Sequence, residues 1–302
     1  HEINKKLKMT VKKHSTHPKN KHQGHYDFDA LIKACPALKK YVKPNKFGDT
    51  SIDFSDPKGV KTLNRALLAL QYNVKSWNIP NDYLVPPIPG RADYIHYVAA
   101  ELLPNKIGSK ITVLDIGTGA SLIYPIVGSQ EYGWRFIATD IDENSINSCQ
   151  SILNHNAHLK NIELRLQKNS RDTFFGIVES TENIQLSICN PPFHASMEDA
   201  QRGTLRKVNN LGKGIKVKSP KLNFGGTGAE LVTDGGEKKF ICNMIRQSKR
   251  FSENIEWFSS LVSKEVNVKP IISALRDAGV KNKRIITMGQ GNKVSRIICW
   301  KF

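Results

Sequence analysis

The segment of this chain best suited to chemistry is Asn190-Pro191-Pro192-Phe193, which directly follows the apolar run 184–189. The side-chain carbonyl of Asn190 and the backbone carbonyl of Pro191 can together accept both hydrogens of a planar NH₂ group, which leaves the nitrogen lone pair free to attack an electrophile. The prolines keep these acceptors rigid before a substrate arrives. Phe193 offers a flat face for a stacked base. The segment predicts an amine-alkylating site; the alternative is a rigid strand exit with a buried phenylalanine.

A second motif lies earlier, where Asp115, Gly117 and Gly119 form a D-x-G-x-G pattern at the end of an expected strand. Glycines at that point let the backbone turn tightly and approach a ligand closely. Leu122 occupies the position at which a dinucleotide fingerprint has its third glycine, so the pattern disfavours a nicotinamide site. The acid before the glycines is typical of methyltransferases.

Two further side chains are candidate ligands of a nucleoside cofactor. Asp140 ends the second expected strand, where an acid can accept hydrogen bonds from both ribose hydroxyls. Its alternative role is to cap the next helix, which Asp142 can do equally well. Arg91 follows a proline-rich segment and can hold the carboxylate of the methionine portion of S-adenosylmethionine through a bidentate pair. The histidines have no metal-ligand spacing and no Ser/His/Asp set indicates hydrolysis, so we expect no metal.

The elements that must position these residues change in character near residue 110. Before it, apolar spacings predict helices over residues 26–42 (interrupted by Pro36), 56–70 and 91–103. After it, short β-rich runs alternate with helical segments, as in a parallel α/β sheet. Strands are expected at 111–116, 135–140, 162–166, 184–189, 255–262, 284–288 and 295–302, and helices include 144–154, 238–250 and 269–278.

The last two expected strands are joined by residues 289–292, a Gly-Gln-Gly-Asn hairpin loop, so the final strand returns antiparallel. We therefore predict the class I S-adenosylmethionine-dependent methyltransferase fold. It is a Rossmann-like α/β fold with a seven-stranded mixed sheet and helices on both faces, plus a helical N-terminal region. The expected divisions are a basic disordered arm (1–25), a helical region (26–105) and a methyltransferase domain (106–302) with a mobile basic loop (194–224).

The net charge of +18 is concentrated in two segments. Residues 1–25 hold seven lysines and one acid, and residues 194–224 hold seven basic residues and two acids. Such clustering indicates a polyanionic partner such as nucleic acid, although basic residues also serve simply as a solvated surface. Five widely spaced cysteines indicate reduced thiols, and no apolar run is long enough to span a bilayer. We expect a cytoplasmic protein with no membrane association.

Several of these motifs, in this order, resemble one family, formed by bacterial large-subunit ribosomal RNA adenine-N6 methyltransferase F and eukaryotic methyltransferase-like protein sixteen. The resemblance covers roughly residues 17–302. The motifs are Gly90-Arg91-Ala92-Asp93-Tyr94-Ile95-His96, Asp115-Ile116-Gly117-Thr118-Gly119-Ala120-Ser121, Asn190-Pro191-Pro192-Phe193, Asn223-Phe224-Gly225-Gly226, Trp257-Phe258-Ser259-Ser260-Leu261-Val262-Ser263 and the Gly289-Gln290-Gly291 hairpin.

The resemblance implies methyl transfer from S-adenosylmethionine to the N6 atom of one adenine in 23S ribosomal RNA, by a monomer and without a metal. The cofactor contacts that it implies are Arg91, Asp115, Gly117, Gly119, Ser121, Asp140, Asn169 and Asn190. Asn190, Pro191, Pro192 and Phe193 are the implied catalytic residues. At Asn169 the chain departs from the related enzyme, which has a threonine near this position.

Three alternatives stay open at this point. A protein glutamine amide is also a planar NH₂ group, so a protein glutamine N5-methyltransferase uses the same tetrapeptide. A DNA adenine methyltransferase shares the chemistry. From a different class, the chain is compatible with a non-catalytic RNA-binding protein that keeps a relic cofactor pocket.

Overall fold

The computed structural model describes residues 15–192, 233–291 and 293–302. Its centre is a seven-stranded sheet with the order β5-β4-β3-β6-β7-β9-β8. The strands are β3 (Thr112–Ile116), β4 (Arg135–Asp140), β5 (Ile162–Leu166), β6 (Ile184–Cys189), β7 (Ile255–Val262), β8 (Asn282–Gln290) and β9 (Lys293–Lys301). The first five are parallel, and β9 runs antiparallel to both β7 and β8. The predicted fold class is confirmed.

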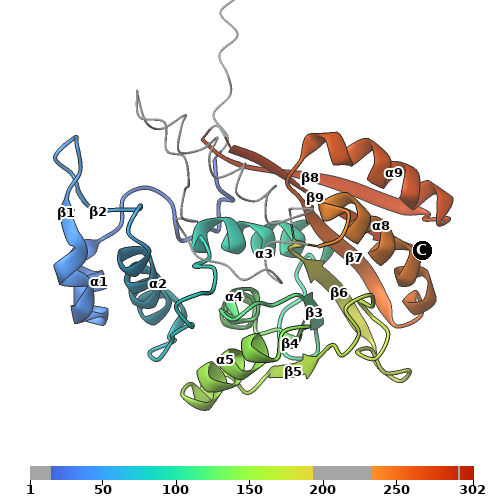
Figure 1. The fold of residues 1–302 in the computed structure, drawn as a ribbon, viewed down its shortest axis with the longest axis horizontal. Coiled ribbons are helices and arrows are strands. Elements are labelled where there is room, and N and C mark those ends of the chain that lie inside the picture. Colours follow the sequence, from blue (N-terminus) through green and yellow to red (C-terminus); the bar gives the residue numbers. More distant parts are fainter. Residues whose placement is uncertain (1–14, 193–232, 292) are drawn as a thin grey trace, which may run out of the picture.

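The helices cover both faces of this sheet (Figure 1). Their bounds are α1 (Phe28–Ala34), α2 (Pro57–Tyr72), α3 (Ile88–Leu102), α4 (Ile123–Tyr132), α5 (Glu143–Asn154), α8 (Gly236–Ser248) and α9 (Val268–Asp277), with short 3₁₀ turns η1 (Pro36–Tyr41), η2 (Ala157–Leu159), η3 (Lys249–Phe251) and η4 (Glu265–Asn267). The expected helix at 91–103 begins earlier, at Ile88, because Pro89 is tolerated in a first turn, where its missing N–H is not needed.

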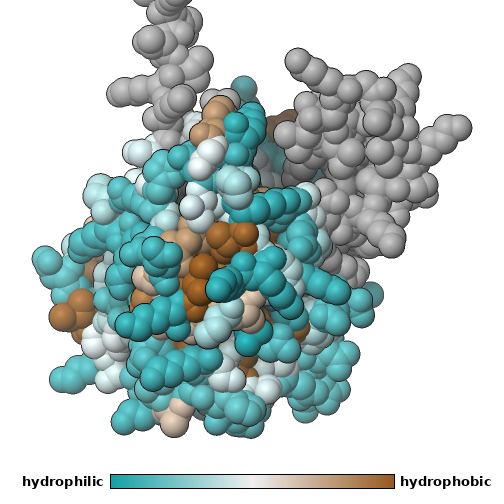
Figure 2. Space-filling model, turned by 90° about the vertical axis from the view of Figure 1, so that its left-hand side faces the viewer, coloured by the Kyte–Doolittle hydropathy of each residue, from teal (hydrophilic) through white to brown (hydrophobic). Residues whose placement is uncertain are grey.

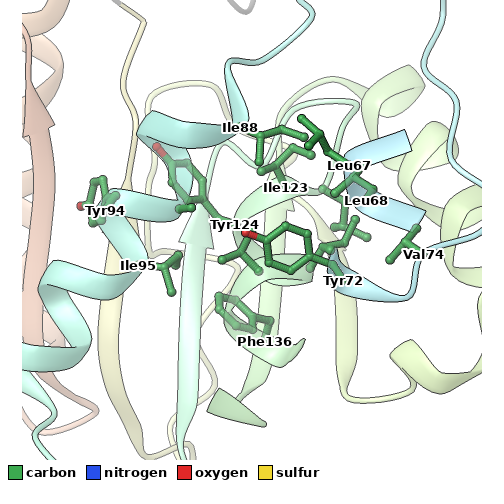
Figure 3. Close-up of a cluster of buried hydrophobic side chains, with 14 of the residues drawn as sticks. Leu67, Leu68, Tyr72, Val74, Ile88, Tyr94, Ile95, Ile123, Tyr124 and Phe136 are labelled. Carbon is green, nitrogen blue, oxygen red and sulfur yellow. The ribbon is translucent and has the colours of Figure 1, made fainter. Parts of the chain in front are cut away.

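The sheet separates two hydrophobic clusters. One holds side chains of α2, α3, α4 and α5, and Figure 3 shows part of it, including Tyr94 beside Tyr124. The other holds side chains of α8 and α9. Because both faces are covered, every residue of β3 is buried. This burial on two sides holds the carboxyl ends of the central strands rigidly in place.

The N-terminal region differs from its prediction in one respect. It contains a two-stranded antiparallel sheet, β1 (Val42–Pro44) with β2 (Thr50–Ile52), where only helices were expected. Its helices also share one continuous hydrophobic core with the sheet. The side seen in Figure 2 is mainly hydrophilic with some hydrophobic surface, and the exposed large apolar side chains of this region are Phe47, Phe54 and Leu70.

The predicted disordered arm, residues 1–25, also differs from the structure, because its last part is packed against the helices. Asn20 and His22 are only 3% and 4% exposed. The Asn20 amide donates to the Asp93 carboxylate at 2.5 Å, and the His22 ring is hydrogen-bonded to the Tyr72 hydroxyl at 2.9 Å. Polar contacts of this kind leave no hydrophobic periodicity in the sequence. Residues 1–14 and the predicted mobile loop, 194–224, lie outside the described residues.

Two buried histidines, His22 in this packed segment and His96 on α3, make stability depend on pH. Burial lowers the pKa of His22 and of His96 to about 4 from the usual 6.5. Both are neutral in the folded protein but protonated below pH 6.5 in the unfolded chain, so stability falls as pH drops from 6.5 towards 4. At pH 5 we expect a loss of about 2 kcal/mol for each histidine, seen as a melting temperature several degrees lower than at pH 7.5.

The double variant His22→Gln/His96→Gln provides the comparison. Burial raises the pKa of Asp93, so this acid makes the folded state more stable as pH falls, opposite to the two histidines. Asp93 is present in both the parent and the double variant, so its contribution cancels when the two are compared. Thermal unfolding at the two pH values should show a smaller difference for the variant. An undiminished difference contradicts this assignment.

Candidate active site

One pocket of about 830 Å³ lies at the carboxyl ends of β3, β4 and β6. The strand order places β4 on one side of β3 and β6 on the other, so this is the point where the chain connections change direction. Open α/β sheets bind ligands at such a point, and the volume suits a nucleoside-sized molecule together with a second group. The predicted site residues that line it are Arg91, Gly117, Gly119, Ser121, Asp140, Asn190, Pro191 and Pro192.

The turn after β3 forms the floor of this pocket. Gly117 and Gly119 have φ values of 72° and 68°, a left-handed conformation that side chains disfavour. A Cβ on Gly117 would meet no atom within 4 Å, so the backbone borders open space there. The amide of Gly119 donates to the Asp140 carboxylate at 2.9 Å, which ties the turn to the end of β4.

The structure divides the roles of the two acids after β4. Asp142 caps α5 by accepting from the amides of Asn144 and Ser145 at 3.3 and 3.1 Å. Asp140 is therefore not needed as a helix cap, and it lines the pocket instead. Burial raises the pKa of Asp140, and the amides of Asp142 and Gly119 that bond to it lower the pKa. A carboxylate has about four acceptor positions, so two remain for a ligand.

Asp115 lies behind the pocket wall rather than in it. Its side chain is 0% exposed, and neither oxygen has a hydrogen-bond partner within the described residues. Burial raises its pKa to about 7, with the nearby Thr118 hydroxyl and the Arg91 charge lowering it and Asp140 raising it further. A carboxyl in this setting is sensitive to any charge that enters the pocket.

Arg91 extends from the first turn of α3 into the pocket wall. Its guanidinium lies over the Tyr124 ring at 5.9 Å, and within the described residues it makes no ion pair or hydrogen bond. Its five N–H donors are therefore available to an anionic ligand.

The tetrapeptide begins where β6 ends, on the far side of β3 from Asp140. Asn190 and Pro191 both line the pocket. The Asn190 Oδ1 atom is buried and has no hydrogen-bond partner among the residues described. Buried amide oxygens are nearly always paired, so an unpaired one in a pocket wall indicates a missing donor. Phe193 lies outside the described residues.

The loop after β5 reaches the pocket through residues other than Asn169. Asn169 does not line the pocket; its side chain is exposed and bonded within the loop, donating to the Asp172 carboxylate at 2.7 Å and accepting from the Arg171 amide at 3.1 Å. Gln167 and Ser170 line the pocket in its place. Asn169 therefore stabilises the loop conformation in which Gln167 and Ser170 face the pocket.

Sequence reasoning missed the wall formed by α8, which contributes Lys239, Phe240, Asn243 and Arg246. Asn243 and Gln247 both donate to the Arg171 carbonyl, at 2.9 and 2.8 Å, and so join α8 to the loop after β5. The helix itself was predicted at 238–250, but no sequence signal shows which strand ends it overhangs. That placement depends on the path of the chain before it.

Two further observations concern the rest of the described chain. No three His, Cys, Asp or Glu side chains in it gather closely enough to hold a metal ion. None of its helices combines the length and apolar character needed to cross a bilayer.

Comparison with known proteins extends over almost the whole chain. A family model described as RNA methyltransferase matches residues 10–302. The protein named ribosomal RNA large subunit methyltransferase F in Shewanella baltica (strain OS185) is 50% identical over 98% of this chain and 83% of that protein. The protein of the same name in Bacteroides fragilis (strain YCH46) is 46% identical over 97% of this chain and 100% of that protein.

Solved structures give the same result. The human METTL16 catalytic domain in complex with MAT2A 3′UTR hairpin 1 superposes with a TM-score of 0.81 at 28% identity, covering 95% of this chain and 96% of that one. The N-terminal domain of human METTL16 in complex with SAH gives a TM-score of 0.75 at 25% identity, covering 95% and 98%. The fold, the pocket and these relatives agree: the chain belongs to the ribosomal RNA large subunit methyltransferase F family of RNA methyltransferases.

Proposed function

We propose that this protein transfers a methyl group from S-adenosylmethionine to the N6 atom of an adenine in 23S ribosomal RNA. The main support is the Asn190 oxygen, which is buried and unpaired in the wall of a pocket that also presents Asp140. One end of the pocket thus suits a nucleoside cofactor and the other suits a planar amine. The names of the relatives, which refer to large-subunit ribosomal RNA, support this choice of substrate.

In the cofactor half, we assign three groups by their chemistry. Asp140 accepts hydrogen bonds from the ribose hydroxyls, for which it has acceptor positions left. Arg91 holds the methionine carboxylate with its unpaired guanidinium. Asp115, beneath the turn at Gly117, supplies negative potential to the cationic groups of the donor. Binding of the donor in turn favours the ionised form of the Asp115 carboxyl.

In the substrate half, Asn190 and the Pro191 carbonyl accept the two N6 hydrogens, and Phe193 stacks on the base once it has left its helix. S-adenosylmethionine, when bound, supplies a methyl group already activated on a sulfonium. The adenine nitrogen attacks this methyl in line, the carbon–sulfur bond breaks, and one N6 proton leaves to solvent. The task of the protein is to align nucleophile and methyl, an arrangement that accounts for very large rate gains.

The charge distribution favours RNA over a protein acceptor. The pocket lining includes Arg171, Lys239 and Arg246, and the sequence has its two most basic segments at 1–25 and 194–224. Neutralised phosphates release counterions and add affinity that does not depend on sequence. A peptide carrying a glutamine amide offers no such charge. We propose that the protein acts as a monomer in the cytoplasm.

An acceptor panel tests this function. Purified protein with labelled S-adenosylmethionine should methylate large-subunit ribosomal RNA, and should leave adenine-containing duplex DNA and peptide release factors unlabelled. Transfer to DNA or to a release factor would replace the proposal by the corresponding alternative. Absence of transfer to every acceptor, together with no cofactor binding in calorimetry, would support a non-catalytic RNA-binding protein.

A further inference from the structure

The strand that carries the tetrapeptide separates from its neighbour just before it ends. The registered pairing of β6 with β7 stops at Ser187 and Phe258. Both strands continue beyond this point, β6 alongside β3 up to Cys189 and β7 alongside β9 up to Val262. The last two residues of β6 therefore lack a β-ladder on the β7 side, directly before Asn190.

Side chains fill this gap with a buried chain of hydrogen bonds. The Ser259 hydroxyl donates to the Ser187 carbonyl at 2.8 Å, the Tyr94 hydroxyl lies 2.9 Å from the Ser259 hydroxyl, and the Cys189 amide donates to the Tyr94 oxygen at 3.3 Å. Tyr94 and Ser259 are each 0% exposed. These hydrogen bonds therefore connect the end of β6 directly to Ser259 of β7 and Tyr94 of α3.

The orientation of these hydrogen bonds follows from which groups can donate and which can accept. A carbonyl can only accept, so the single Ser259 hydroxyl hydrogen goes to Ser187. An amide N–H can only donate, so Tyr94 accepts from Cys189. The Tyr94 hydrogen must then go to Ser259. All bonds run one way, from Cys189 through Tyr94 and Ser259 to Ser187, an arrangement in which each bond polarises the next.

Tyr94 is also linked to the cofactor half of the pocket. It lies three residues after Arg91 on α3, so the two side chains leave the helix on the same side. Both contact the Tyr124 ring, Tyr94 edge-on at 5.4 Å between centroids and Arg91 at 5.9 Å. One helix therefore fixes a group proposed to hold the cofactor and the strand end that presents Asn190.

We propose that Tyr94, acting through Ser259, is a positioning residue for methyl transfer. It sets the path of the end of β6 and with it the distance between the amine acceptors and the methyl donor. The inference rests on the proposed function of Asn190. A displacement of about 1 Å between reacting groups reduces turnover by roughly a hundredfold, so a small relaxation of this strand end is enough to be measured.

The variant Tyr94→Phe keeps the ring in the core and removes the hydroxyl. We expect kcat to fall by about 10- to 100-fold while KM for S-adenosylmethionine and for RNA stays within about twofold, the pattern of a lost alignment rather than lost binding. Ser259→Ala should act alike. The double variant should be no slower than the worse single one, because both changes break the same chain.

Tyr132→Phe is the matched control. It removes a tyrosine hydroxyl bonded to the ring of His96 at 2.7 Å, in the same core but away from the pocket. It should lower the melting temperature and leave kcat unchanged. The inference is overturned if Tyr94→Phe behaves like this control. It is also overturned if the losses in kcat caused by Tyr94→Phe and Ser259→Ala multiply in the double variant.

The outcome separates this inference from the proposed function. An inactive Asn190→Ala variant with a fully active Tyr94→Phe variant rejects the positioning role alone. A fully active Asn190→Ala variant rejects the proposed site and the inference with it. Should Tyr94→Phe fail to fold, Ser259→Ala decides between the same two results.

Discussion

Asn190→Ala should reduce the single-turnover rate of methyl transfer about 100- to 1000-fold, the loss seen when one preorganised polar group at a reacting centre is removed. Without the side-chain oxygen only the Pro191 carbonyl remains to hold the amine. The stability change should have the opposite sign to that of an ordinary buried substitution. An unpaired buried oxygen destabilises a fold by about 1–3 kcal/mol, so the variant should be at least as stable as the parent.

The control for this experiment is Asn183→Ala, at the other end of the same strand. Asn183 is exposed, and its side-chain oxygen accepts from the side-chain amide of Gln185 at 3.3 Å. Its removal should change neither the rate nor the melting temperature appreciably. Rates are measured at saturating donor and RNA, so that binding does not contribute. A parent-like rate for Asn190→Ala removes the catalytic assignment.

Asp140→Asn should weaken binding of S-adenosylmethionine by about 2–3 kcal/mol, or roughly 30- to 150-fold in Kd. The substitution keeps the shape and one acceptor oxygen, so the bond from the Gly119 amide at 2.9 Å can persist. It removes the charge that makes the two ribose hydrogen bonds strong. Titration calorimetry in the absence of RNA measures the effect directly.

Asp142→Asn is its control, two residues along the same connection. Asparagine is as good a helix cap as aspartate, so α5 should keep its first turn. We expect its Kd to stay within about twofold of the parent. Equal weakening by both substitutions would mean that the connection as a whole, rather than the Asp140 carboxylate, supports the cofactor.

The sheet and the pocket floor were predictable because their signals are local. β3 and β6 are runs of apolar residues, as burial on both faces requires, and a D-x-G-x-G turn after the first strand predicts a ligand site by its backbone geometry. The sequence left the roles of Asp140 and Asp142 open. The structure separated them, since only coordinates show which carboxylate reaches the amides of α5.

What was missed depends on contacts between distant segments. Asn20 is buried by a bond to Asp93, 73 positions away, and carries no periodic pattern. The α8 wall joins the β5 loop through Asn243 and Arg171, 72 positions apart. Asn169 lies in the loop after β5, yet its own hydrogen bonds turn its side chain to the loop instead of the pocket. Such placements follow from the tertiary path of the chain.

The most direct test is to identify the atom that receives the methyl group. Large-subunit ribosomal RNA labelled by the protein is digested to nucleosides and resolved by mass spectrometry. The proposal that Asn190 and the Pro191 carbonyl hold an exocyclic NH₂ predicts a single labelled product, N6-methyladenosine, which Asn190→Ala forms about 100- to 1000-fold more slowly. Label on a ribose oxygen or on a ring carbon would contradict the account, because neither group presents two hydrogens to Asn190 and Pro191. Label on the amino group of cytosine or guanine would contradict the choice of adenine.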